Sequence, residues 1–323
     1  MDRRNFIERL TVGGGALAST SLMGFAIPEN QKTKRINLQD SSEELAADVV
    51  VIGGGLGGCA TAFAALRNNL TVILTEETDW IGGELTQQGV PPDEHNWIET
   101  HGAPQLYRDF RTSIREYYKK NYPLTDAAKA VQYLNPGAGS VSKLCHEPKV
   151  AVSVLQDMMA PYISAGKLVL LLEHKVVDAS VQSDVVNSVT VKNLRSNKLI
   201  KFKAPYFVDA TELGELLPIT GTEYVTGAES KSQTGELHAT EKANLKNNQA
   251  FTMCFAIDYV PGEDWTIPKP AEYDFWKEFA PKMKKPWSGK MIGLHYSNPS
   301  TLEPKELGFN PDGSHTGNLL NLW

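Results

Sequence analysis

A glycine-rich loop between two short apolar runs constrains the fold of this chain more than any other feature. The first run, Asp48–Ile52, is apolar and β-branched, as expected of a buried strand in a parallel sheet. The loop places Gly53, Gly55 and Gly58 at the spacing G-x-G-x-x-G, and the following "CATAFAAL" predicts a helix. A second buried strand is predicted over Leu70–Thr75. This order of strand, loop, helix and strand predicts an α/β fold of Rossmann-like type around a parallel sheet.

The positions within this loop have separate physical reasons. Gly53 permits a tight turn, Gly55 lets the backbone approach a pyrophosphate, and Gly58 lets the helix lie close to the strand. The helix start, at Leu56 and Gly57, offers free backbone N–H groups and a partial positive charge to phosphates. The spacing therefore predicts a dinucleotide site, and a glycine-rich turn without a ligand is the alternative.

An acidic residue and a second glycine pair follow the loop. Glu76 ends the second predicted strand, where a carboxylate can accept hydrogen bonds from an adenosine ribose. Gly82 and Gly83 come shortly afterwards, in "GGELTQQG", which resembles the FAD-binding arrangement of flavoproteins with two dinucleotide-binding domains. That resemblance implies that Gly82, Gly83 and Thr86 run beside the pyrophosphate and flavin. A simple solvent-exposed turn is the alternative.

Three longer segments carry a more specific resemblance. They are "WIGGELTQQGVPPDEH" from Trp80, "LCHEPKVAVSVLQDMM" from Leu144 and "YFVDATELGELLPITG" from Tyr206. Together they resemble a family of bacterial FAD-dependent oxidoreductases, some of whose members are labelled xanthan lyase. More distantly, the chain is similar to the flavin domain of heterodisulfide reductase A-like proteins. The similarity covers roughly residues 48–323, and it implies FAD as the cofactor and an oxidoreductase activity.

Heterodisulfide-type relatives hold iron–sulfur clusters through clustered cysteines. The three cysteines of this chain, Cys59, Cys145 and Cys254, are far apart and form no CxxC motif. We therefore expect neither an iron–sulfur cluster nor a disulfide framework.

The middle of the chain predicts two amphipathic helices and a run of strands. The helices are expected over residues 102–118 and 150–163, with Arg111 and Arg115 largely off the apolar stripe of the first. Strands are expected over residues 168–172, 176–181, 186–191, 199–203 and 206–210. This run resembles the β-meander of FAD folds. The resemblance places Ala210 and Thr211 near the cofactor, and Val176 where backbone groups pair with adenine.

These patterns predict the domain organisation. We expect a signal peptide over residues 1–26 and a linker over 27–47. An FAD-binding domain over 48–220, with a helical insertion at about 90–165, is followed by part of a second, α+β substrate domain over 221–323. The relatives continue past this point with a further glycine-rich segment, so we expect the chain to be C-terminally truncated.

The first 26 residues have the layout of an export signal. A charged start is followed by a short apolar segment rich in glycine, alanine and leucine, and then by small residues. The pair Arg3 and Arg4 resembles the twin-arginine signal, which exports folded, cofactor-loaded proteins. A retained hydrophobic anchor is the alternative. We expect a periplasmic or secreted protein without stable membrane insertion after the signal is removed.

A polar cluster after the glycine pair supplies the candidates for catalysis. Asp93, Glu94 and His95 follow two prolines and are expected near the flavin ring, where an imidazole or a desolvated carboxylate can accept a proton. The alternative is that they cap the helix starting near Gly102 and tie down a loop. No second ligand cluster has suitable spacing, so a metal site is not expected.

A second cluster, Cys145 followed by His146, invites a nucleophilic role. Adjacent residues seldom present both side chains to one substrate atom. The following Glu147 and Pro148 are typical of a helix start. We therefore favour a structural role for this pair.

Charge limits the partners that the chain can have. Its 323 residues carry 32 Lys and Arg against 38 Asp and Glu, for a formal net charge of −6, with no basic block. Nucleic acid is therefore not an expected partner. We expect a small-molecule substrate, and the sequence defines neither this substrate nor the electron acceptor.

Two other functions stay open at the level of sequence. One is a non-catalytic FAD-binding fragment that needs a missing C-terminal segment. The other is a polysaccharide lyase-type enzyme in which FAD is structural or absent. A carbohydrate-derived substrate is suggested only by the expected export and by the family labels.

Overall fold

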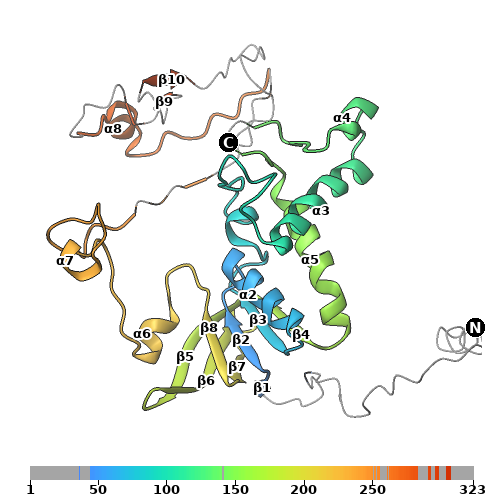
Figure 1. Ribbon diagram of the computed structural model, residues 1–323. Helices are drawn as coiled ribbons and strands as arrows, with labels where there is room; N and C mark the ends of the chain where they lie inside the picture. The colour runs from blue at the N-terminus through green and yellow to red at the C-terminus, as the bar shows by residue number, and fades with distance from the viewer. Residues whose placement is uncertain are drawn as a thin grey trace, which may run out of the picture. The chain divides into compact units, whose positions relative to one another are not determined.

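A four-stranded parallel sheet, in which all strands run in the same direction, is the first of the sheets in the described chain (Figure 1). The computed structural model describes residues 36, 44–139 and 142–249, and between 251 and 306 it describes residues 251, 253–254, 260, 262–282, 290–291, 295–297 and 303–306. In sheet order the strands are β4 (Leu168–Leu172), β3 (Val72–Glu76), β2 (Val49–Ile52) and β8 (Tyr206–Asp209). All three neighbouring pairs are parallel. The predicted parallel sheet is confirmed.

A second sheet is built mainly from the predicted meander. Its order is β1 (Glu44–Ala46), β7 (Leu199–Lys203), β6 (Val185–Asn193) and β5 (His174–Gln182). The pairs β5–β6 and β6–β7 are antiparallel, whereas β1 and β7 are parallel. The α/β class, with a parallel sheet and a β-meander, is therefore confirmed.

The expected linker over residues 27–47 is wrong at its C-terminal end. Residues 44–46 form β1, in which Leu45 lies opposite Phe202 of β7. The strand is short and its partner lies far along the chain, so local periodicity does not indicate it. Residues 1–26 lie outside the described residues. Within the described part of the chain, no helix is long and apolar enough to cross a bilayer.

Each face of the parallel sheet packs against a different layer, because successive strand residues point to opposite faces. Val49 and Val51 of β2 belong to the core that the helices cover, whereas Val50 and Ile52 pack with residues of the meander sheet, such as Val191. All four residues of β2 are buried, as expected for a strand covered on both faces.

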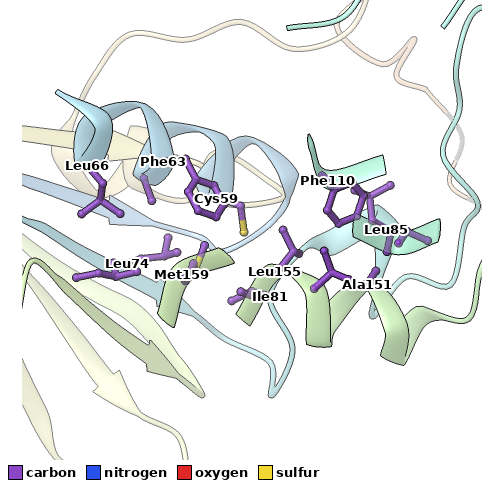
Figure 2. Packing of buried hydrophobic residues seen from close by; sticks show 14 of the residues in the cluster. Cys59, Phe63, Leu66, Leu74, Ile81, Leu85, Phe110, Ala151, Leu155 and Met159 are labelled. Atoms are coloured by element: carbon purple, nitrogen blue, oxygen red, sulfur yellow. The ribbon is translucent and has the colours of Figure 1, made fainter. Parts of the chain in front are cut away.

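The helical layer consists of α2 (Leu56–Arg67), α3 (Gln105–Asn121) and α5 (Pro148–Ser164), with the short α4 (Asp126–Ala130) between the last two. In Figure 2, Cys59, Phe63 and Leu66 of α2 lie near Leu74 of β3 and Met159 of α5. The buried positions of α2 recur every three to four residues, which gives the helix one apolar face.

The helix predicted to start near Gly102 begins at Gln105 instead. Its N-cap is Pro104, and no side chain caps it. The alternative in which residues 93–95 cap this helix is therefore wrong. Arg111 and Arg115, expected off the apolar stripe, are both buried, for a reason that the candidate site makes clear.

The chain after the second sheet contains only short elements among the described residues. They are α6 (Leu216–Thr220), α7 (Lys231–Thr234), α8 (Tyr273–Glu278), and the antiparallel strands β9 (His295–Ser297) and β10 (Pro304–Glu306).

Candidate functional site

A recess lies at the carboxyl ends of the parallel strands and beside β5. Its cavity volume is about 30 Å³. The residues that line it are Ile52, Gly53, Glu76, Glu77, Gln87, His174, Lys175, Val176, Ala210, Thr211, Glu212 and Glu215. The chain leaves β2 through α2 toward β3 on one side, and β8 lies on the other side. The order of strands therefore reverses between β2 and β8, where open α/β sheets bind their ligands.

Two glycines hold the loop tightly against β8. Gly53 has a φ of +99°, and a Cβ atom there would lie 2.1 Å from the backbone oxygen of Ala210. A Cβ atom at Gly58 would lie 1.9 Å from the backbone oxygen of Gly53. Both positions therefore require glycine, the first for conformation and close approach, the second for close approach alone.

The start of α2 has the properties of a phosphate site. Gly55 is its N-cap and supplies no side-chain hydrogen bond, and the first turn contains no acidic residue. Leu56 is 40% exposed, and a Cβ atom at Gly57 would meet no atom within 4 Å. We call Gly55, Leu56 and Gly57 the phosphate cradle. Free N–H groups and the positive end of the helix dipole fit a pyrophosphate there.

Glu76 lies at the end of β3 and lines the recess, as predicted. Its carboxylate also stabilises the glycine loop, because one oxygen accepts the N–H of Gly54 at 2.8 Å. The other oxygen accepts the N–H and the hydroxyl of Thr78, at 2.9 and 2.8 Å. Each carboxylate oxygen can accept two hydrogen bonds. The oxygen that faces Gly54 therefore retains capacity for a ribose hydroxyl.

The second glycine pair packs against the glycine loop. Gly82 donates its N–H to the backbone oxygen of Gly54 at 2.8 Å, and its φ is +107°. A Cβ atom at Gly83 would lie 3.0 Å from the Cα atom of Gly55. The pair therefore lets the bend, which contains η1 (Gly83–Leu85), lie directly against the phosphate cradle.

Thr86 is placed differently from the prediction. It is 1% exposed, and its hydroxyl donates to the backbone oxygen of Ile81 at 2.7 Å. Its side chain holds the bend together from inside and does not line the recess. The threonine hydroxyl can close this turn because Thr side chains bond readily to nearby backbone groups.

Val176, Ala210 and Thr211, which the sequence placed near the cofactor, all line the recess, and their contact with a cofactor stays a prediction. The hydroxyl of Thr211 donates to Asp209 at 2.7 Å and accepts the N–H of Glu215 at 2.8 Å. It therefore shapes the turn after β8.

Charged residues at the recess were not predicted from the sequence. Lys175 of β5 pairs with Glu77 and with Glu215, at 2.9 Å in each case. These hydrogen bonds raise the pKa of Lys175, so it stays cationic. The three residues are distant in sequence and meet only because the end of β3, the start of β5 and the turn after β8 lie at one place. No local pattern indicates them.

The three candidates for catalysis do not line the recess. Asp93 and His95 are exposed. The Nδ1 atom of His95 accepts the N–H of Trp97 at 3.1 Å, which leaves Nε2 to donate toward the backbone oxygen of Gly102 at 3.4 Å. The ring of His95 thus holds together the loop between residues 95 and 102. A catalytic role for His95 stays a prediction.

Glu94 lies in a buried ion network. It accepts hydrogen bonds from Tyr107 and Arg111, and Arg111 also pairs with Glu99. The side chains of Arg111 and Glu94 are 3% and 5% exposed. Burial and the bond to Glu94 raise the pKa of Tyr107, so its hydroxyl remains a donor. The network fixes the loop over residues 94–99 to α3, as the alternative to catalysis expects of Glu94, and it explains the burial of the arginines.

Cys145 and His146 are both buried. Nδ1 of His146 lies 3.0 Å from the backbone oxygen of Leu144, and Nε2 lies 3.3 Å from that of Leu85 in the second bend. Burial raises the pKa of Cys145 and lowers that of His146. A thiol with a raised pKa is a poor nucleophile, which agrees with the favoured structural role.

Cys59 is also a packing residue. Its thiol donates to the backbone oxygen of Gly54 at 3.2 Å, and burial raises its pKa to about 12. Within the described residues, no three His, Cys, Asp or Glu side chains are grouped to hold a metal ion.

Comparison with known proteins agrees with this geometry. A sequence model of the family described as FAD dependent oxidoreductase matches residues 48–316, which is more than half of the chain. The carotenoid phi-ring synthase of Chlorobaculum tepidum is 31% identical over 124 residues, covering 36% of this chain and 18% of the synthase.

Similar solved structures include L-proline dehydrogenase from P. horikoshii, with 19% identity and a TM-score of 0.28 over 52% of this chain and 23% of that one. The glycerol-3-phosphate dehydrogenase from Bacillus halodurans complexed with FAD has 16% identity and a TM-score of 0.34, over 54% and 36%. The chain spans well under half the length of each of these three proteins.

Proposed function

Because the chain belongs to the family of FAD dependent oxidoreductases, we propose that the recess between β2, β3, β5 and β8 binds the adenosine and pyrophosphate of FAD, and that the flavin oxidises or reduces a small organic substrate. Bound FAD supplies the redox chemistry, and the protein binds and orients it. The substrate and the electron acceptor belong to the whole protein and are not assigned.

The observation that carries this proposal is the phosphate cradle beside the switch point of the sheet. The start of α2 has an uncapped N-terminus, and the second glycine bend packs against it. Such a helix start binds phosphate through its N–H groups. Glu76 at the end of the next strand supports the adenosine end, because one of its oxygens has remaining capacity to accept a ribose hydroxyl.

Val176 and Ala210 are proposed to contact the cofactor mainly through backbone atoms. Val176 is 5% exposed within β5, and it lines the recess together with Glu76. Gly53 and Gly58 are proposed to act by shaping the loop rather than by touching the cofactor, since their neighbours are backbone atoms of the protein.

FAD binding by the purified full chain tests the proposal. Flavin absorbance that persists through gel filtration, and that acid precipitation releases to the supernatant, is the expected result. The substitution Gly55→Ala should reduce FAD affinity, because the new Cβ atom points into the phosphate cradle. In the cofactor-free chain it meets only the flexible carboxylate of Glu212, at 3.2 Å, so the fold should tolerate it.

Gly57→Ala is the matched control. Its Cβ atom would meet nothing within 4 Å, and its position is one of the variable positions of the glycine motif. We expect the control to bind FAD about as well as the unaltered chain. A folded chain that binds no FAD when saturated with it, or equal loss in both variants, would contradict this site.

A further inference from the structure

Glu212 places a carboxylate at the phosphate cradle. It follows Thr211 in the turn after β8, and its Oε1 atom lies 3.2 Å from the Cβ position of Gly55 and 3.5 Å from that of Gly83. The carboxylate therefore lies where the glycine loop and the second glycine bend face each other. A pyrophosphate at the start of α2 would need this same space.

The charges around the recess explain why the carboxylate lies there. Lys175 is the one Lys or Arg among the described residues that line the recess, and it is already paired with Glu77 and Glu215. The nearest unneutralised positive field for Glu212 is the start of α2, which attracts anions. Within the described part of the chain, Glu212 makes no side-chain hydrogen bond, and the residue is exposed, so its side chain can rotate away.

We propose that Glu212 is an internal competitor for the pyrophosphate of FAD. In the cofactor-free chain its carboxylate lies in the field of the helix start, and on binding the cofactor displaces it toward solvent. This inference rests on the proposed FAD site, and it assigns to that site a residue, Glu212, that weakens the affinity of the chain for FAD. The carboxylate of Glu212 also adds to the excess of negative charge at the recess, which repels a dianionic ligand.

The competition predicts an unusual salt dependence. Glu76, Glu77, Glu212 and Glu215 line the recess against Lys175, so a negatively charged cofactor is repelled at long range. Salt screens this repulsion over a Debye length of about 10 Å at 0.1 M. FAD affinity should therefore rise with salt in the unaltered chain, the opposite of what a cationic phosphate site shows.

The test compares FAD affinity in the full chain, Glu212→Gln and Glu116→Gln, by flavin fluorescence at low and high salt. Glu116 lies on α3, pairs with Lys119 and does not line the recess, so its substitution changes the net charge equally without touching the cradle. We expect Glu212→Gln to bind FAD about tenfold more tightly at low salt, with a weaker salt dependence, and Glu116→Gln to match the unaltered chain. ADP, which carries the pyrophosphate without the flavin, should show the same ratio.

The outcomes separate this inference from the site on which it rests. If the unaltered chain binds FAD and Glu212→Gln binds it equally or more weakly, Glu212 is no competitor and only this inference falls. An equal gain in Glu116→Gln also overturns it, since net charge alone would then explain the effect. If no variant binds FAD or ADP while all remain folded by circular dichroism, the proposed site fails, and this inference fails with it.

Discussion

At the scale of single residues, neighbouring glycines of the loop have opposite surroundings. A Cβ atom at Gly58 would lie 1.9 Å from a backbone oxygen of Gly53, whereas one at Gly57 would meet open space. We expect Gly58→Ala to lower the free energy of unfolding by about 1–3 kcal/mol, because the helix must move away from the strand. Urea unfolding of the cofactor-free chain measures this cost.

Gly57→Ala is again the control, since both substitutions lie in the first turn of α2 and add one methyl group. It should leave stability unchanged or raise it by about 0.5–1 kcal/mol, because alanine favours the helix over glycine. Equal unfolding midpoints for the two variants would show that the loop and the helix are not packed as closely as described.

Sequence reasoning at this scale was accurate for positions that follow from the spacing of strand, loop and helix, and inaccurate for side-chain partners that depend on the folded surroundings. The loop glycines and Glu76 were predicted, because close approach and strand position follow from spacing. Thr86 was predicted to face the cofactor, but its hydroxyl bonds inward to Ile81. Glu212 and Lys175 were not predicted, because what they face depends on elements distant in sequence.

At the scale of elements, apolar runs bounded by polar turns predicted most of the strands. The predictions over 168–172 and 199–203 coincide with β4 and β7, and those for β5 and β6 differ by a few residues at their ends. The exceptions are β1, β9 and β10, which are each three residues long, and β1 has a single partner strand among the described residues. A short edge strand buries too little apolar surface to leave a recognisable pattern.

The hydrophobic periodicity of the sequence also did not indicate how α3 is anchored. Arg111 and Arg115 are one turn apart and lie next to the apolar positions Phe110 and Ile114, so they share the buried face. Charged side chains are buried only when paired. The acidic residues that precede the helix were the available signal. Glu94 was a candidate for catalysis, and tying down the loop was the alternative.

This pairing predicts a large effect of Arg111→Met. The substitution leaves Glu94 buried without its cation, and removing one partner of a buried ion pair costs about 3–5 kcal/mol. Arg67→Met is the matched control. The Arg67–Asp109 pair has a distance of 3.5 Å and both side chains are nearly half exposed, so its loss should cost less than about 1 kcal/mol. Chemical unfolding of both variants compares the costs, and similar values would mean that the Glu94 network does not hold the loop to α3.

At the scale of the whole molecule, the layers of the described core leave the carboxyl ends of the parallel strands accessible to a ligand. Helices cover one face of the parallel sheet and the meander sheet covers the other. With both faces filled, the strand ends are where a ligand can reach the sheet, and the recess lies there. The position of the site follows from topology, which is why it could be predicted before any side-chain contact was known.

This arrangement predicts which part of the cofactor the described residues recognise. Glu76 lines the recess, and the phosphate cradle follows Gly53 of the recess at the start of α2. Both are suited to adenosine diphosphate rather than to the flavin ring. We expect FAD and ADP each to raise the free energy of unfolding, by about 2.7 kcal/mol when the ligand is at 100 times its dissociation constant. FMN, which lacks the adenosine half, should give no shift at the concentration at which FAD stabilises the chain. Thermal unfolding with each ligand makes the comparison. Stabilisation by FMN equal to that by FAD would place recognition at the flavin and remove the recess from the binding site.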